Sequence, residues 1–223
     1  MLRRLVRAVL GVYMRLYHGL ELHGAERLPA RGPAIVLLNH GSLLDVPALM
    51  VLDPYDNTIL IAKASLFNIP GVAWLLREWG AIPVERQGRD STGVRAVLKA
   101  LQKGHVVAVA AEGRRTRSGR LEPINSVLAK ISASADVPLV PVGISGSYRA
   151  LPPGTVVPRP RKIVVRVGEP FRLERGTNAA VAAARIRSEI AALLPPEQQP
   201  LPASADAAAV QPESESRNEL GVG

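Results

Sequence analysis

The chain has 223 residues and no cysteine, so its length fits one domain with a sizeable core, while disulfides and thiolate catalysis are excluded. The formal net charge is +9, and because residues 195–223 carry five acids against one base, or −4, the rest of the chain carries +13. That balance favours phosphate-bearing partners. The aromatic content of 4% and the lack of a recognition motif argue against nucleic acid, and the four scattered histidines lack zinc-site spacing, so no metal is expected.

Residues 1–20 are predicted to form an amphipathic helix. Apolar residues recur at helical spacing in one stripe, and the arginines fall largely on the other side. This pattern is typical of a helix that lies in a membrane interface. The seven uncharged residues between Arg7 and Arg15 are too few to span a bilayer, and no signal-peptide cleavage site follows. The alternative is an ordinary amphipathic helix that packs on its own domain.

Residues 21–194 show strands that alternate with helices. Apolar runs predict strands at 34–38, 58–62, 81–84, 105–111, 138–144 and 162–168, and helices at 43–52, 70–79, 91–103, 125–135 and 179–194. The alternation predicts an α/β domain, a layered mixed sheet flanked by helices, with its site at the strand ends. Residues 195–223 are rich in Pro, Ala, Ser, Gln and Glu and are predicted to form a disordered acidic tail.

His40 and Asp45 follow the first of these strands, in the stretch Asn39 to Asp45. A neutral imidazole oriented by a carboxylate is suited to removing a proton from a hydroxyl. On a continuous helix the two side chains would lie roughly 140° apart, so they meet only if the chain bends, and Gly41 permits a bend. Two alternatives stay open. Asp45 also completes an S-x-x-D helix start with Ser42, and a histidine beside a strand is often structural.

A loop with four arginines follows the apolar run 106–111. It begins with Glu112 and Gly113, and its arginines are Arg114, Arg115, Arg117 and Arg120. Guanidinium groups pair with phosphate oxygens, and glycine lets backbone N–H groups approach them. Lys63 and Arg86 stand at the ends of two other predicted strands. Taken alone, the loop is more typical of a solvated basic surface or of one that touches anionic lipid, and Glu112 could clamp an arginine. Cations at several strand ends, however, predict a phosphate site.

Together these residues resemble the 1-acylglycerol-3-phosphate (lysophosphatidate) acyltransferase family of glycerolipid acyltransferases. The N-H-x4-D block of that family matches Asn39, His40 and Asp45. The second block matches Gly80, Ile82, Val84 and Arg86, and the fourth, V-P-x-V-P-V, matches residues 137–142. The third, F-P-E-G-T-R-S, matches at Glu112, Gly113 and Arg115 but departs at Ala110, Ala111, Arg114 and Thr116. The resemblance extends from about residue 24 to residue 173.

The resemblance implies an enzyme that moves a fatty acyl group from acyl-CoA or acyl-carrier protein to the free hydroxyl of 1-acylglycerol 3-phosphate, giving phosphatidic acid. His40 would deprotonate that hydroxyl, and Asp45 would orient the imidazole. The groups implied to hold the substrate phosphate are Lys63, Arg86, Glu112, Gly113 and Arg115. No cofactor is implied beyond the acyl donor. The expected location is the cytoplasmic face of the cell membrane, with membrane lipids as partners of a peripheral or monotopic protein.

Three other functions stay open. The acceptor in the same chemistry could be glycerol 3-phosphate, another lysophospholipid or an aminoacyl lipid, since Arg114 adds charge where the family has a hydroxyl. A non-catalytic, cationic lipid-binding protein would need no base. A hydrolase with Ser42 as nucleophile is disfavoured, because residues two apart at a bend align poorly and no G-x-S-x-G elbow is present.

Overall fold

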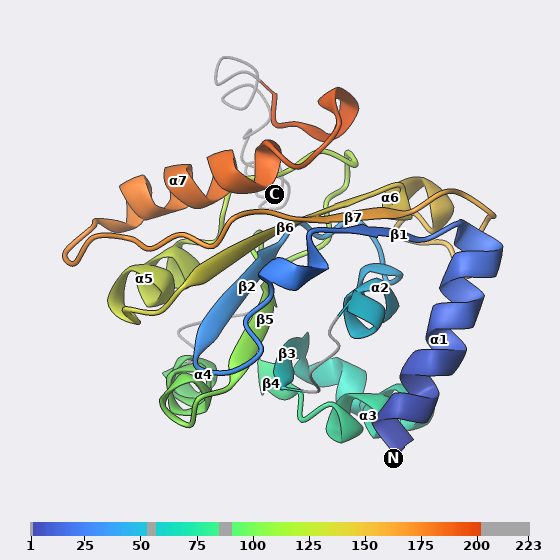
Figure 1. Ribbon diagram of the computed structural model, residues 1–223, viewed down its shortest axis with the longest axis horizontal. Helices are drawn as coiled ribbons and strands as arrows, with labels where there is room; N and C mark the ends of the chain where they lie inside the picture. Colours follow the sequence, from blue (N-terminus) through green and yellow to red (C-terminus); the bar gives the residue numbers. More distant parts are fainter. Residues whose placement is uncertain (1, 53–56, 85–90, 202–223) are drawn as a thin grey trace, which may run out of the picture.

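The computed structural model describes residues 2–52, 57–84 and 91–201. Within these ranges the strands form one seven-stranded sheet in the order β1-β7-β6-β2-β5-β3-β4, in which every neighbouring pair is parallel except β6 and β7. The strands are β1 (Glu21–His23), β2 (Ala34–Leu38), β3 (Thr58–Lys63), β4 (Ile82–Val84), β5 (Val106–Ala110), β6 (Leu139–Ser145) and β7 (Val164–Val167). The predicted α/β domain with a layered mixed sheet is confirmed (Figure 1).

Helices lie on both sides of this sheet (Figure 1). They are α1 (Leu2–His18), α2 (Asp45–Leu52), α3 (Pro70–Glu78), α4 (Ser91–Gln102), α5 (Ser126–Ser134), α6 (Ser147–Ala150) and α7 (Ala179–Ala191). Met14 of α1 and Leu49 of α2 belong to one buried cluster, whereas Val97 of α4, Leu128 of α5 and Ile186 of α7 belong to another. Strands β2 and β6 are buried at every residue, as expected of central strands between two helical layers.

Strands β3 and β5 separate partway along their length. β3 pairs with β5 only from Thr58 to Leu60, and its last three residues, Ile61 to Lys63, pair with β4 instead. The last two residues of β5, Val109 and Ala110, therefore have a strand partner only on the β2 side among the described strands. This division leaves a gap at the end of the sheet where parallel strands usually carry functional groups.

Helix α1 has apolar residues on two sides, where one apolar stripe was predicted. Val6, Leu10 and Met14 face the core, whereas Leu5 and Leu16 on the outer side are 62% and 84% exposed. The helix thus has a packed apolar side and an exposed one. It packs on its own domain, as the alternative interpretation expected, and the membrane-interface role stays a prediction that the exposed side could serve. No helix in the part of the chain that the structure describes is long and apolar enough to cross a bilayer.

The packed part of the chain extends beyond residue 194, where the tail was predicted to begin. A 3-10 helix, η3 (Pro196–Gln198), follows α7, and the main-chain carbonyl of the buried Gln198 accepts a hydrogen bond of 2.9 Å from the Leu121 N–H. Polar composition therefore did not prevent this first segment from packing. Residues 202–223 lie outside the described residues, and their disorder stays a prediction.

Several short elements were not predicted. They are β1, α6 and the 3-10 helices η1 (Ala25–Arg27), η2 (Ala64–Asn68) and η3. β1 reads Glu-Leu-His and has no apolar run, and it exists because its backbone pairs with β7. Such segments depend on distant partners rather than on their own periodicity.

Candidate active site

The bend after β2 brings His40 and Asp45 together as predicted. β2 ends at Leu38 and α2 begins at Asp45, so His40 stands in the loop between them. The Nδ1 atom of His40 lies 2.9 Å from Oδ2 of Asp45, and the two side chains are 13% and 1% exposed. Because an ionised carboxylate only accepts hydrogen bonds, Nδ1 carries the hydrogen in a neutral ring, which leaves Nε2 as the basic atom.

The same aspartate oxygen also fixes the start of α2. Oδ2 of Asp45 accepts hydrogen bonds of 2.8 Å from the N–H groups of Gly41 and Ser42. One oxygen of Asp45 therefore contacts both the imidazole of His40 and the N–H groups at the start of the helix, so the two interpretations of this residue are compatible. Oδ1 of Asp45 is buried and has no hydrogen-bond partner within the described chain.

The loop that carries His40 is fixed from two further directions. The Asn39 amide donates to the Ile144 carbonyl at 2.9 Å and accepts from the Ile144 N–H at 2.7 Å, as a neighbouring strand would. The Ser42 hydroxyl donates to the Leu151 carbonyl at 2.9 Å. Asn39 is thus part of the support for the histidine, a role that the sequence pattern alone did not suggest. Ser42 is already committed to the main chain, which further disfavours it as a nucleophile.

Glu112 holds the main chain of His40. One carboxyl oxygen accepts the N–H of His40 at 2.7 Å, and the other accepts the N–H of Glu122 at 3.0 Å. The Thr116 N–H donates to the carbonyl of His40 at 2.8 Å, so both main-chain groups of His40 bind the arginine loop. Among the described residues no salt bridge joins Glu112 to an arginine, so the clamp of an arginine is not what its carboxyl group forms here. Its contact with the substrate phosphate stays a prediction.

Burial raises the pKa of Glu112 to about 8, although the two N–H groups that it accepts lower it. Between the ordinary pKa of a glutamate and pH 8, the folded protein therefore binds a proton that the unfolded chain has lost. The free energy of unfolding is expected to fall as pH rises through this window, by an amount on the order of a few kcal/mol.

Urea unfolding of wild type and Glu112→Gln between pH 5 and pH 8.5 tests this expectation. The variant should lose the downward slope, whereas the exposed Glu174→Gln should keep it. Burial lowers the pKa of His18, so that group removes stability as pH falls, equally in all three proteins. Parallel curves for wild type and Glu112→Gln would show that Glu112 is ionised throughout.

An apolar cavity of about 540 Å³ opens beside the imidazole. It reaches into the division of the sheet, since Ala62 of β3 and Ala110 of β5 both line it. Its apolar walls come from α2, α4, α5 and the strands β2, β3 and β5. Its polar lining groups are His40, Lys63, Asp45, Glu112, Arg114 and Asn125.

The predicted phosphate ligands are placed unequally around this cavity. Lys63, Glu112 and Gly113 line it, whereas Arg115 does not. Arg114 lines it instead and pairs with Glu122, with 3.0 Å between Nη2 of Arg114 and Oε2 of Glu122. Arg86 lies outside the described residues. The loop therefore turns Arg114, the residue that departs from the family block, toward the cavity.

Tyr148 joins the arginine loop to the histidine loop and has no signal in the sequence. Its hydroxyl donates to the Arg117 carbonyl at 2.7 Å. Its ring lies against Gly119, where a Cβ atom would stand 2.8 Å from the ring and φ is 78°. A Cβ atom on Gly41 would stand 3.2 Å from Tyr148 Cβ. Glycine is therefore needed at position 119 for both space and backbone conformation.

A protein-family model described as Acyltransferase matches residues 19–145, which is more than half of the chain. The chain therefore belongs to the acyltransferase family. This agrees with the histidine and aspartate pair and with the resemblance of the sequence blocks.

Curated relatives bear more specific names. The chain is 29% identical over 142 residues to 1-acyl-sn-glycerol-3-phosphate acyltransferase BAT2, chloroplastic, of Brassica napus, an overlap that covers 62% of this chain and 41% of that protein. It is 28% identical over 142 residues to LPAT1, chloroplastic, of Arabidopsis thaliana, covering 62% and 39%. The chain thus spans about two fifths of the length of these relatives.

A solved structure shares the fold. The crystal structure of the 1-acyl-sn-glycerophosphate (LPA) acyltransferase PlsC from Thermotoga maritima matches with a TM-score of 0.72 at 23% identity. The match covers 84% of this chain and 76% of that one, so the similarity includes most of the sheet and its helices.

Proposed function

We propose that the protein transfers a fatty acyl group from acyl-CoA or acyl-carrier protein to the free hydroxyl of 1-acylglycerol 3-phosphate, forming phosphatidic acid in phospholipid biosynthesis. The observation that carries this proposal is the His40–Asp45 pair at the polar end of an apolar cavity whose rim bears Lys63 and Arg114. A lipid acceptor with a phosphate and a long acyl group needs these three features together.

His40 acts as the base in this reaction. Its Nε2 atom takes the proton of the acceptor hydroxyl as the hydroxyl oxygen attacks the thioester carbonyl carbon. The carbon–sulfur bond then breaks, and the departing thiolate takes the proton back from the imidazolium. Asp45 stabilises the imidazolium through the 2.9 Å contact with Nδ1. The acyl group passes directly to the acceptor, so no acyl-enzyme forms.

Cations near His40 hold the acceptor phosphate. Lys63 and Arg114 supply positive charge at the cavity, which Gly113 also lines. Arg115, which is half-buried, and Arg86 stay predicted ligands. Holding the hydroxyl near Nε2 and the thioester is expected to account for a large share of the rate enhancement.

The apolar cavity is suited to an acyl chain. Its walls come from strand and helix side chains such as Leu60, Val97 and Ile131. Each methylene group that leaves water for such surroundings contributes about 0.8 kcal/mol. The cavity also keeps water from the thioester, which limits hydrolysis.

Helix α1 is proposed to place the protein on the cytoplasmic face of a membrane, as a peripheral or monotopic protein with membrane lipids as partners. Its exposed stripe includes Leu5, Val9, Val12 and Leu16. Arg4 and Arg15 are also exposed on the helix, where they can meet lipid phosphates.

A panel of acceptors tests the proposed substrate. Purified protein with acyl-CoA should release CoA with the highest kcat/KM on 1-acylglycerol 3-phosphate, lower on glycerol 3-phosphate and lowest on zwitterionic lysophospholipids. Glycerol 3-phosphate lacks the acyl chain that the apolar walls favour, and zwitterionic lysophospholipids lack the phosphate dianion that Lys63 and Arg114 favour. A thiol reagent reports the CoA without background, since the protein has no cysteine. A preference for a zwitterionic or neutral acceptor would contradict the proposed substrate while leaving the acyl transfer intact.

A further inference from the structure

The loop between α6 and β7 carries a second exposed apolar group. We call residues 152–161 the valine loop, after Val156 and Val157, which are 90% and 73% exposed. Together with Leu16 of α1, at 84%, they are the three most exposed large hydrophobic side chains among the described residues. Isolated exposed residues need no explanation, but a cluster of the most exposed ones marks an interaction surface.

The valine loop is held in a fixed shape. Four prolines restrict its backbone, Pro152, Pro153, Pro158 and Pro160. The N–H and hydroxyl of Thr155 donate to the Pro152 carbonyl at 3.1 and 2.7 Å, and the Arg159 N–H donates to the Ala150 carbonyl at 2.8 Å. The loop therefore keeps the two valines exposed to solvent. Because its backbone is already restricted, it loses little conformational entropy on binding a partner.

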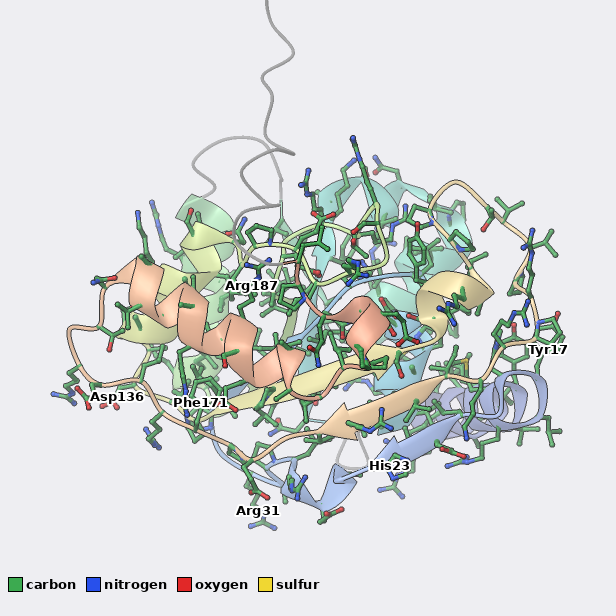
Figure 2. All side chains as sticks on the ribbon, turned by 90° about the horizontal axis from the view of Figure 1, so that it is seen from above. Tyr17, His23, Arg31, Asp136, Phe171 and Arg187 are labelled. Carbon is green, nitrogen blue, oxygen red and sulfur yellow. The ribbon has the colours of Figure 1, made fainter. Side chains whose placement is uncertain are left out.

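The valine loop is joined to the end of α1 beside Leu16. The Tyr17 hydroxyl donates to the Pro158 carbonyl at 3.0 Å, and Nδ1 of His18 lies 3.3 Å from the Arg161 carbonyl. In both views α1 and this loop lie at the same edge of the molecule, and Figure 2 shows Tyr17 at that edge. The end of α1 that carries Leu16 and the valine loop therefore lie side by side at one edge of the protein.

Positive charge surrounds the valines. Arg159 and Arg161 are exposed, and neither forms a salt bridge with an acidic side chain in the described part of the chain. Glu21 forms a salt bridge of 2.7 Å with Lys162, the residue that follows Arg161. Apolar side chains flanked by unpaired guanidinium groups match the interface of an anionic bilayer, where acyl chains lie beneath phosphate groups.

We propose that the valine loop inserts Val156 and Val157 into the interface of an anionic bilayer, as a second membrane contact next to α1. This inference rests on the membrane association proposed above and adds a second point of contact. Two joined contacts fix the orientation of the protein on the membrane, which one helix alone would leave free to roll about its axis.

A fluorescent probe tests the contact directly. Because the chain has no cysteine, Val157→Cys in the full-length protein accepts a single environment-sensitive label. Vesicles of phosphatidylcholine with phosphatidylglycerol should shift its emission to shorter wavelength, and brominated acyl chains should quench it. The matched control is Val181→Cys on α7, an exposed valine (55%) that should show neither effect.

Vesicle flotation measures how much the two valines contribute to the binding of the protein to vesicles. The double variant Val156→Asp/Val157→Asp should bind these vesicles roughly tenfold more weakly than wild type, as expected for the loss of two apolar groups from the interface. Val181→Asp should bind like wild type, and near-identical circular dichroism spectra should show that all three proteins fold.

Wild-type binding by the double variant, together with an unshifted probe at position 157, would overturn the proposal. A probe that shifts only when another protein is added, and not with vesicles, would overturn it in favour of a protein partner. Neither readout depends on acyl transfer. A protein that shows the shift but transfers no acyl group would leave the valine loop proposal standing and refute the proposed function.

Discussion

His40→Ala is expected to lower the rate of acyl transfer about 10²-fold or more, because it removes the base that takes the proton from the acceptor hydroxyl. The effect should appear in kcat, with little change in the KM for the acceptor, since the cavity and its cations remain. The fold should also remain, because Glu112 and Thr116 bind the main chain of His40 and not its side chain. Initial rates of CoA release at saturating acceptor measure the loss.

His23→Ala is the matched control for this substitution. His23 is exposed on the edge strand β1, where its imidazole lies 3.6 Å from a carboxyl oxygen of Glu21, and its removal should leave the rate unchanged. If His40→Ala keeps most of the wild-type rate, the base has been assigned wrongly. If wild type and variant are equally inactive on every acceptor, the non-catalytic lipid-binding alternative is favoured.

Asp45→Asn is expected to cost on the order of 10²-fold in rate at nearly unchanged stability. The asparagine carbonyl can still accept the N–H groups of Gly41 and Ser42, which keeps the start of α2. Nδ1 of His40 contacts that same oxygen position, so the carbonyl also keeps accepting the Nδ1 hydrogen. What is lost is the negative charge that stabilises the imidazolium formed when His40 takes the proton. Rates and urea unfolding curves of the same preparations measure both effects.

Asp45→Ala separates the two roles of this aspartate. It removes the acceptor for both main-chain N–H groups, so it should lower the free energy of unfolding by about 1–3 kcal/mol in addition to the loss of rate. An asparagine variant with wild-type activity would show that Asp45 only starts the helix. Equal destabilisation by both substitutions would show that the amide does not replace the carboxylate at the helix start.

The alternation of strands and helices could be predicted from the sequence because apolar runs such as 34–38 and 139–145 are buried from both sides and leave a strong pattern. The side of α1 that packs against the domain could not be predicted from the sequence. Its apolar residues cover more than half of the helix circumference, and only contact with α2 and the sheet decides that Met14 is buried and Leu16 is not.

The local part of the site was also predictable. His40 and Asp45 are five residues apart, and a single bend brings them together. The role of Glu112 was not predictable, since its partner, the N–H of His40, lies 72 residues away and is a main-chain group that every residue except proline has. The choice between Arg114 and Arg115 depended on how the loop turns at Gly113, where φ is 74°. Neighbouring arginines give no sign in the sequence of which one faces the cavity.

The most direct test of the proposed function is to measure both products of one reaction, with purified protein, acyl-CoA and 1-acylglycerol 3-phosphate. Mass spectrometry should find one molecule of phosphatidic acid for each CoA released, and no appreciable CoA release when the acceptor is omitted. CoA release with free fatty acid in place of phosphatidic acid would indicate a thioesterase, and no CoA release on any acceptor would indicate a protein without this activity. Either result would contradict the proposed transfer of an acyl group to the lipid hydroxyl.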